Sequence, residues 1–131
     1  MTTPRSPFEN PPEDRILAQD DLVMALWDAF PVSKGHVLIV VKRPVARLAD
    51  LSAEEAERVW RWAQAMVRRL SYELDPKPDG FNLGLNDGPA AGQTIPHLHF
   101  HVIPRYDGDV EDPRGGIRWV VPDKANYWEA G

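Results

Sequence analysis

Three of the four histidines in this chain lie close together, at positions 97, 99 and 101, and they alternate with apolar residues. Successive side chains of an extended strand point to opposite faces, so His97, His99 and His101 are expected on one face of a strand. The apolar residues between them would then face a core. Imidazole titrates near neutral pH and serves as a nucleophile, a proton carrier or a metal ligand, so this pattern predicts a functional site.

A structural role and a metal site are the alternatives to catalysis by these histidines. A single histidine in a strand is usually satisfied by a nearby carbonyl, but three on one face beside a glycine-containing loop favour a site. Alternating histidines can also chelate zinc. Here the third histidine lies about 13 Å from the first by strand rise, a long reach for three nitrogens around one ion. The spacing therefore disfavours a zinc site built from this strand alone.

The loop at residues 87–94 leads directly into the histidines and contains Gly88 and Gly92. Exposed backbone N–H groups of such a loop can converge on an anion. The formal net charge of −5 argues against wholesale neutralisation of a nucleic-acid backbone, so we expect a small ligand and no nucleic acid. If that ligand is anionic, hydrogen-bond donors at the site must outweigh the repulsion from the protein's net negative charge.

The composition also limits the compartment and the domain organisation. The sequence has no cysteine, which excludes disulfides and thiolate–zinc clusters and fits a reducing compartment. It shows no apolar leader after Met1 and no run long enough to cross a bilayer, so we expect a cytoplasmic protein without a membrane partner. A length of 131 residues predicts one domain, at 15–131, after a flexible N-terminal arm at 1–14 that is rich in proline.

Phosphorus chemistry would use the histidines in unequal roles. It needs a group attacking in line with the leaving oxygen, and donors for the charge that develops on the phosphate oxygens. His99 has a histidine on each side along the strand face, so it is the natural nucleophile, with its second nitrogen held by a hydrogen bond. His101 would then donate to the phosphate or the leaving group, and His97 would orient the set. General-base activation of water by His99 is the alternative, and the residues alone leave it open.

Hydrophobic periodicity predicts the elements that position these residues. Ser52 and Glu55 form a capping box ahead of a long helix, whose apolar residues recur every three or four positions through Leu74. Trp60 falls off that apolar stripe and is expected at the surface or at a partner interface. Alternation and β-branched runs predict strands at 16–18, 22–27, 36–41 and 81–86, besides the histidine strand. Residues 117–121 are expected to form a last strand or an interface segment.

The segment from His97 to Ile103 resembles the signature of the histidine triad (HIT) nucleotide hydrolases and transferases, in which histidines alternate with apolar residues. The resemblance extends roughly from Arg15 to Tyr106 and includes the fourth histidine, His36. It implies an α+β fold with a five-stranded antiparallel sheet, one long and one short helix. It also implies a homodimer that shares a ten-stranded sheet.

The resemblance further implies attack on the α-phosphorus of a nucleoside phosphate through a nucleotidyl-histidine intermediate. Neither a cofactor nor a metal is implied for the chemistry, and any Mg²⁺ would arrive with a polyphosphate substrate. By position, His99 matches the nucleophile, His101 the contact to phosphate and leaving group, and His97 and His36 the supporting histidines. Asp28 matches a ribose ligand. The implied phosphate-site residues are Asn86, Gly92, Gln93 and Thr94. The implied base-pocket residues are Leu26 and Leu17, which packing in the core explains equally well.

The chain departs from some relatives in ways that bear on metal binding. The segment Ser6-Pro7-Phe8-Glu9 stands where they carry a Cys-x-x-Cys pair for structural zinc, and Pro44 replaces a further ligand, so no structural metal is expected. The third histidine argues against the uridylyltransferase branch, which has glutamine there. The acidic balance and the missing zinc-finger extension argue against the branch that repairs adenylated DNA ends.

The loop before the histidine strand favours one branch of the family. It resembles that of the dinucleoside polyphosphate hydrolases related to the fragile histidine triad protein, and this predicts an enzyme that cleaves substrates such as diadenosine tetraphosphate. A purine nucleoside phosphoramidase, or a nucleotide-binding regulatory module with incidental turnover, are the alternatives. In the C-terminal tail, Arg118 is a candidate phosphate contact, with a surface or interface role as the alternative.

Overall fold

An antiparallel sheet organises the computed structural model, which describes residues 6–129. Over those residues the sheet has five strands in the order β1-β2-β3-β5-β4, and every neighbouring pair is antiparallel. The strands are β1 (Ile16–Gln19), β2 (Val23–Trp27), β3 (Val37–Val41), β4 (Gly80–Leu85) and β5 (His99–Arg105). The predicted α+β class and five-stranded sheet are confirmed.

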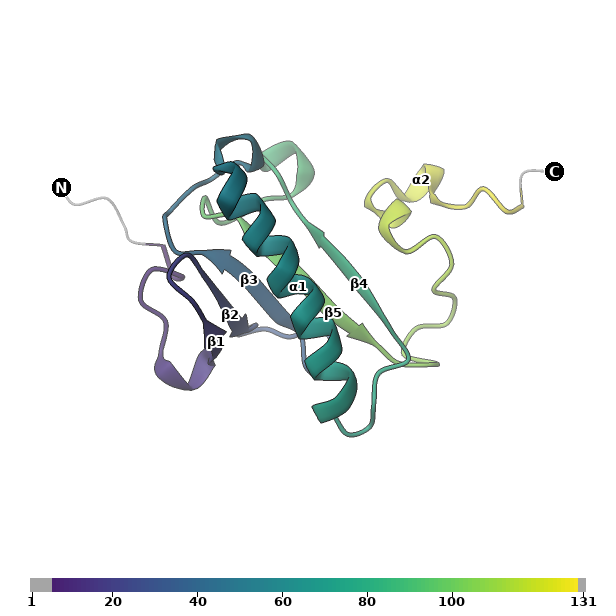
Figure 1. The fold of residues 1–131 in the computed structure, drawn as a ribbon. Helices are drawn as coiled ribbons and strands as arrows, with labels where there is room; N and C mark the ends of the chain where they lie inside the picture. The colour runs from purple at the N-terminus through teal and green to yellow at the C-terminus, as the bar shows by residue number, and fades with distance from the viewer. Residues whose placement is uncertain (1–5, 130–131) are drawn as a thin grey trace.

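One face of this sheet packs against α1 (Ala53–Glu73), which crosses it diagonally (Figure 1). The predicted capping box starts the helix: Ser52 Oγ accepts the Glu55 N–H, and Glu55 Oε1 accepts the Ser52 N–H. The apolar stripe then buries Ala63, Met66 and Leu70 against the sheet. The core on this side also contains residues of the three central strands, namely Val23, Ala25, Val37, Ile39, Val41 and Val102.

The opposite face of the sheet carries a second apolar cluster, and the N-terminal segment covers part of it. Phe8 is only 3% exposed and packs with Leu26, Leu38 and Val40. Of the flexible or loosely docked arm expected at 1–14, residues 6–14 are docked, because burying the Phe8 ring contributes about 1.5–3 kcal/mol and holds the segment on the sheet. Residues 1–5 lie outside the described part.

The C-terminal segment differs from its prediction as a strand. Residues Gly116–Val120 form a 3-10 helix, η4, and Pro122–Ala125 form the short helix α2. Gly115 and Gly116 have φ angles of 90° and 41°, which turn the chain out of the extended conformation, and Pro122 starts the next helix. The segment lies beyond β4, the last strand of the sheet (Figure 1). No helix within residues 6–129 is long and apolar enough to span a membrane.

Candidate active site

Strand β5 divides its side chains between the two faces of the sheet. Phe100 and Val102 point toward α1 and join the helix-side core, whereas His99 and His101 lie on the opposite face. On β3, Leu38 pairs with His101 and Val40 pairs with His99, and both belong to the second cluster. The predicted division of the strand into a packed face and an imidazole face is therefore present for these two histidines.

His97 does not lie on the strand with the other two, as the sequence had predicted, because β5 begins at His99. Its side chain is fully buried and both ring nitrogens have partners: Nδ1 is 2.7 Å from Ser6 Oγ, and Nε2 is 2.7 Å from the Val41 carbonyl oxygen. A carbonyl only accepts, so Nε2 carries the proton and Nδ1 accepts the Ser6 hydroxyl. His97 is thus held in one tautomer.

The hydrogen bond of His99 prepares it for attack. Its Nδ1 lies 2.9 Å from the backbone carbonyl of His97, and that carbonyl requires a donor. The neutral ring therefore carries its proton on Nδ1, which leaves a lone pair on Nε2. An imidazole with a free Nε2 and a fixed Nδ1–H is the form required of a nucleophile at phosphorus.

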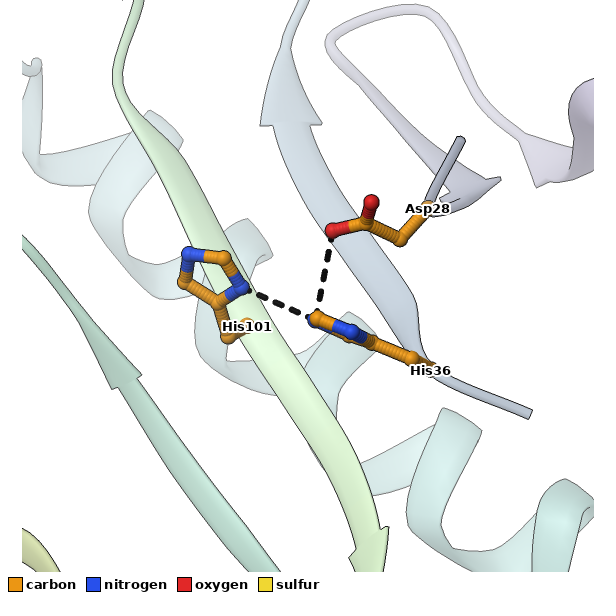
Figure 2. A group of neighbouring side chains, drawn as sticks. All are labelled: Asp28, His36 and His101. Carbon is orange, nitrogen blue, oxygen red and sulfur yellow. Dashed lines mark hydrogen bonds and ion pairs between the residues drawn. The ribbon is translucent and has the colours of Figure 1, made fainter. Parts of the chain in front are cut away.

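A second histidine pair fixes His101. The Val32 N–H donates to His36 Nδ1 at 3.2 Å, so the His36 proton is on Nε2. That Nε2–H donates to His101 Nδ1 at 2.9 Å, with Asp28 Oδ2 at 3.3 Å from the same nitrogen (Figure 2). Because His101 Nδ1 accepts, its own proton is on Nε2, where it is available to a phosphate or a leaving group.

Burial keeps these supporting histidines neutral. It lowers the pKa of His101 to about 4, with repulsion from His99 and His36 acting in the same direction and Asp28 opposing it. Burial likewise lowers the pKa of His36, against the attraction of Asp28, and lowers the pKa of His97. At neutral pH the tautomers assigned to His36, His97 and His101 are therefore those of uncharged rings.

The group formed by Asp28, His36 and His101 also has the composition of a metal site, since one potential ligand atom from each residue lies within 4.8 Å of the others. The hydrogen bonds argue against that use. A metal at His36 Nε2 needs a lone pair there, but the Val32 N–H at Nδ1 places the proton on Nε2. These residues fit a hydrogen-bond relay better than a metal centre.

The loop before β5 is held in place by Gln93. Its Oε1 accepts the Gly88 N–H at 2.8 Å, and its Nε2 donates to the carbonyls of Ala46 and Ile95 at 2.8 and 3.0 Å. Both amide hydrogens are thus engaged, so Gln93 fixes the loop in this structure, and its assignment to the phosphate site stays a prediction. Of the other residues assigned to phosphate, Gly92 and Thr94 are exposed in this loop, and Asn86 is half-buried at the end of β4.

The two predicted base-pocket leucines lie on opposite faces of the sheet. Leu26 is fully buried in the cluster on the imidazole face, together with Phe8 and Leu38. Leu17 instead packs against the helix-side core, which favours the core-packing alternative for this residue. Alternation along β1 turns its side chain to the other face, and an apolar residue satisfies either core equally well.

Arg118 is also occupied away from the histidines. Its guanidinium donates to the carbonyls of Ala125 and Lys124 and lies over the Tyr127 ring, at 4.8 Å from the ring centroid. These contacts support a role in folding the C-terminal segment. This local structural role was neither the phosphate contact nor the surface or interface role expected for Arg118 from the sequence.

Two site residues escaped sequence reasoning, and both belong to the N-terminal segment. Ser6 bonds His97, and the Phe8 ring lies 5.6 Å from the His97 ring and 5.2 Å from the His99 ring, measured between centroids. Phe8 left a weak signal, as a large apolar residue in a polar stretch. Ser6 left none, because its contact spans 91 positions of sequence.

Known proteins of related sequence cover most of this chain. A bis(5'-adenosyl)-triphosphatase of Saccharomyces cerevisiae is 33% identical over 118 residues, which cover 88% of this chain and 53% of the relative. An AP-4-A phosphorylase of Mycobacterium tuberculosis is 35% identical over 113 residues, or 82% of this chain and 57% of the relative. The chain thus spans about half the length of these relatives.

Solved structures show the same fold. A HIT family protein from Bacillus anthracis superposes with a TM-score of 0.67 at 34% identity, over 72% of this chain and 65% of the other. The NitFhit protein of Caenorhabditis elegans gives a TM-score of 0.74 at 32% identity, over 92% of this chain and 27% of the other. The model of the HIT domain family matches residues 9–108. The chain, with its two oriented histidine pairs, belongs to the HIT domain family.

Proposed function

We propose that this protein hydrolyses dinucleoside polyphosphates at the α-phosphorus through a nucleotidyl-His99 intermediate. The observation that carries the proposal is the pair of assigned tautomers on β5. His99 presents a lone pair at Nε2 and His101 presents a proton at Nε2, with ring centroids 5.2 Å apart. The names of the two relatives, a diadenosine triphosphatase and an AP-4-A phosphorylase, support this substrate class.

In the first half of the reaction the His99 Nε2 lone pair forms the P–N bond. The bond between the α-phosphorus and the bridging oxygen breaks, and its electron pair leaves with that oxygen. A polyphosphate departs as an anion, so a hydrogen bond from His101 Nε2–H is enough to stabilise the developing charge. His36, held by Val32 and Asp28, keeps that proton on the correct nitrogen of His101.

In the second half, water attacks phosphorus and the P–N bond pair returns to His99. The products are AMP and the remaining nucleotide, and one water proton is released to solvent. Inorganic phosphate in place of water would give ADP, which is the reaction that the name of the mycobacterial relative suggests for that protein. No metal ion takes part on the protein side, and Mg²⁺ would enter only as the counterion of the polyphosphate.

The remaining roles follow the positions of the residues. Asp28 lies at the end of the site near His36, where it would accept hydrogen bonds from ribose hydroxyls. Leu26 is fully buried in the apolar cluster on the imidazole face, so it would support the base pocket from beneath without touching the base. Asn86 and the loop residues Gly92 and Thr94 would surround the phosphates, and Gln93 would hold that loop in shape.

We also propose that two copies of the chain pair through β4. This strand ends the sheet with β5 as its neighbour on one side, and it has no lysine, proline or bulge of the kind that protects an edge. Antiparallel pairing with β4 of a second copy would produce the ten-stranded sheet expected for the family. Light scattering or sedimentation at assay concentration decides between dimer and monomer.

Product chromatography tests the activity. Diadenosine tetraphosphate and adenosine phosphoramidate are each incubated with the wild type and with His99→Asn, with and without EDTA, Mg²⁺ and inorganic phosphate. We expect the wild type, but not the variant, to convert the tetraphosphate to AMP and ATP. EDTA should act only by removing Mg²⁺ from the substrate. ADP as the main product in the presence of inorganic phosphate would show that the enzyme is a phosphorylase. Faster release of AMP from adenosine phosphoramidate would make the phosphoramidate the preferred substrate. Absence of all products would contradict the proposal.

A further inference from the structure

The hydroxyl of Ser6 joins the N-terminal segment to the nucleophile through two hydrogen bonds. Its Oγ accepts the Phe8 N–H at 3.1 Å and donates to His97 Nδ1 at 2.7 Å. The backbone carbonyl of His97 in turn holds His99 Nδ1 at 2.9 Å. A path of two contacts therefore leads from Ser6 to the imidazole that carries the reactive lone pair.

His97 can transmit this contact because its ring is held on both sides. Its ring is fully buried and is bonded on one side to Ser6 and on the other to the Val41 carbonyl. It lies just before β5, whose first residue is His99. Movement of the His97 ring would therefore move the carbonyl that orients His99.

Without the Ser6 hydroxyl, the two ring nitrogens of His97 could not both keep a hydrogen-bond partner. Without a donor, Nδ1 is left as a buried acceptor with no partner, which is unfavourable. Protonating Nδ1 instead would remove the proton from Nε2 and face its lone pair toward the Val41 carbonyl oxygen. Either response displaces the ring or mixes its tautomers.

Phe8 adds a second link that starts from the same hydroxyl. The Ser6 Oγ fixes the Phe8 backbone, and the Phe8 ring contacts both His97 and His99. Glu9 N–H also closes back on the Ser6 carbonyl at 3.1 Å, so the turn that presents Ser6 is itself ordered. The segment therefore has a defined geometry against the site.

We propose that Ser6 is a positioning residue: its hydroxyl selects the Nε2–H tautomer of His97 and, through the His97 carbonyl, the orientation of the His99 nucleophile. Ser6 acts on turnover without touching the substrate. The inference rests on the proposed function only for its effect on rate, because the tautomers of His97 and His99 can be observed without any substrate.

The kinetic test compares Ser6→Ala with Ser6→Thr, which keeps a hydroxyl. The control is Ser71→Ala, which removes a serine hydroxyl bonded to the Val67 carbonyl at 2.7 Å within α1. Small misplacements of reacting groups reduce turnover by up to roughly 100-fold, so we expect kcat of Ser6→Ala to fall about tenfold, with KM changed less than about twofold. Ser6→Thr should recover most of kcat, and Ser71→Ala should match the wild type.

The spectroscopic test uses ¹⁵N-labelled histidine, whose ring shifts distinguish protonated from unprotonated nitrogens. In the wild type we expect His97 protonated at Nε2 and His99 at Nδ1, and in Ser6→Ala a mixed His97 tautomer with altered His99 shifts. Circular dichroism at the assay temperature measures the folded fraction, against which kcat is corrected.

Three results would overturn the proposal: a corrected kcat for Ser6→Ala equal to that of Ser71→Ala, unchanged histidine shifts in Ser6→Ala, or wild-type His97 protonated at Nδ1. If the wild type releases no AMP, the proposed function fails, but the tautomer measurement still decides the role of Ser6.

Discussion

Mild acid should destabilise the folded protein through His101. Its pKa is about 4 in the folded state, compared with about 6.5 for an unperturbed histidine. Between these values the unfolded chain binds a proton that the folded protein does not, so unfolding becomes easier as the pH falls. The stabilisation contributed by the neutral ring is therefore complete above about pH 6.5 and is lost as the pH falls toward about 4.

The magnitude follows from these two values. At about 1.4 kcal/mol per pH unit, His101 alone removes about 2 kcal/mol of unfolding free energy between pH 7.5 and pH 5. The buried rings of His36 and His97 add to the loss, because their pKa values are lowered as well. Carboxylates contribute little in this range, since they are largely ionised in the unfolded chain above about pH 5.

Urea denaturation at several pH values between 5 and 7.5 measures the effect in the wild type and in His101→Gln. Glutamine does not titrate and can still accept the His36 Nε2–H. We expect the unfolding free energy of the wild type to fall about 2 kcal/mol more than that of the variant over this range. Equal pH dependence of the two proteins, or NMR titration of His101 near 6.5, would refute the assigned burial and tautomer of this ring.

Four further substitutions test the packing of the sheet and the start of α1. Phe8→Ala should cost about 3–5 kcal/mol in chemical denaturation, because the ring is buried on the sheet; a loss below about 1 kcal/mol would mean that the segment is loosely attached. Ser52→Ala should cost about 1 kcal/mol through the capping box and leave kcat unchanged, as measured by denaturation and steady-state assays. Leu26→Ala should cost about 2–5 kcal/mol and the partly buried Leu17→Ala less, but calorimetry should show weaker AMP binding only for Leu26→Ala; equal weakening would contradict the separation of the two faces.

Local sequence patterns predicted the features that depend on a single helix or strand. The capping box at Ser52 and Glu55 predicted the start of α1, and apolar spacing predicted its buried face. Alternation in β5 predicted that His99 and His101 share a face away from Phe100. These features depend on neighbouring residues, whose periodicity the sequence displays directly.

Local patterns could not predict contacts between segments that lie far apart in the sequence. The bond from Ser6 to His97 fixes a buried histidine outside the strand, although the His-x-His spacing continues unbroken through it. Gln93 illustrates the same limit, because spacing cannot distinguish an amide that binds phosphate from one that ties a loop to the Ala46 carbonyl. For Leu17, spacing left the base pocket and the core as equal alternatives, because an apolar side chain is compatible with either face of the sheet.

The central claim is that His99 attacks phosphorus, and trapping the covalent species tests it most directly. Wild type and His99→Asn are mixed with excess diadenosine tetraphosphate in EDTA, quenched on the millisecond scale, and analysed by intact mass and peptide mapping under conditions that preserve P–N bonds. We predict an AMP adduct on His99 that forms at least as fast as AMP is released, and none in the variant. AMP release without an adduct at any quench time, or turnover by His99→Asn at the wild-type rate, would contradict the account.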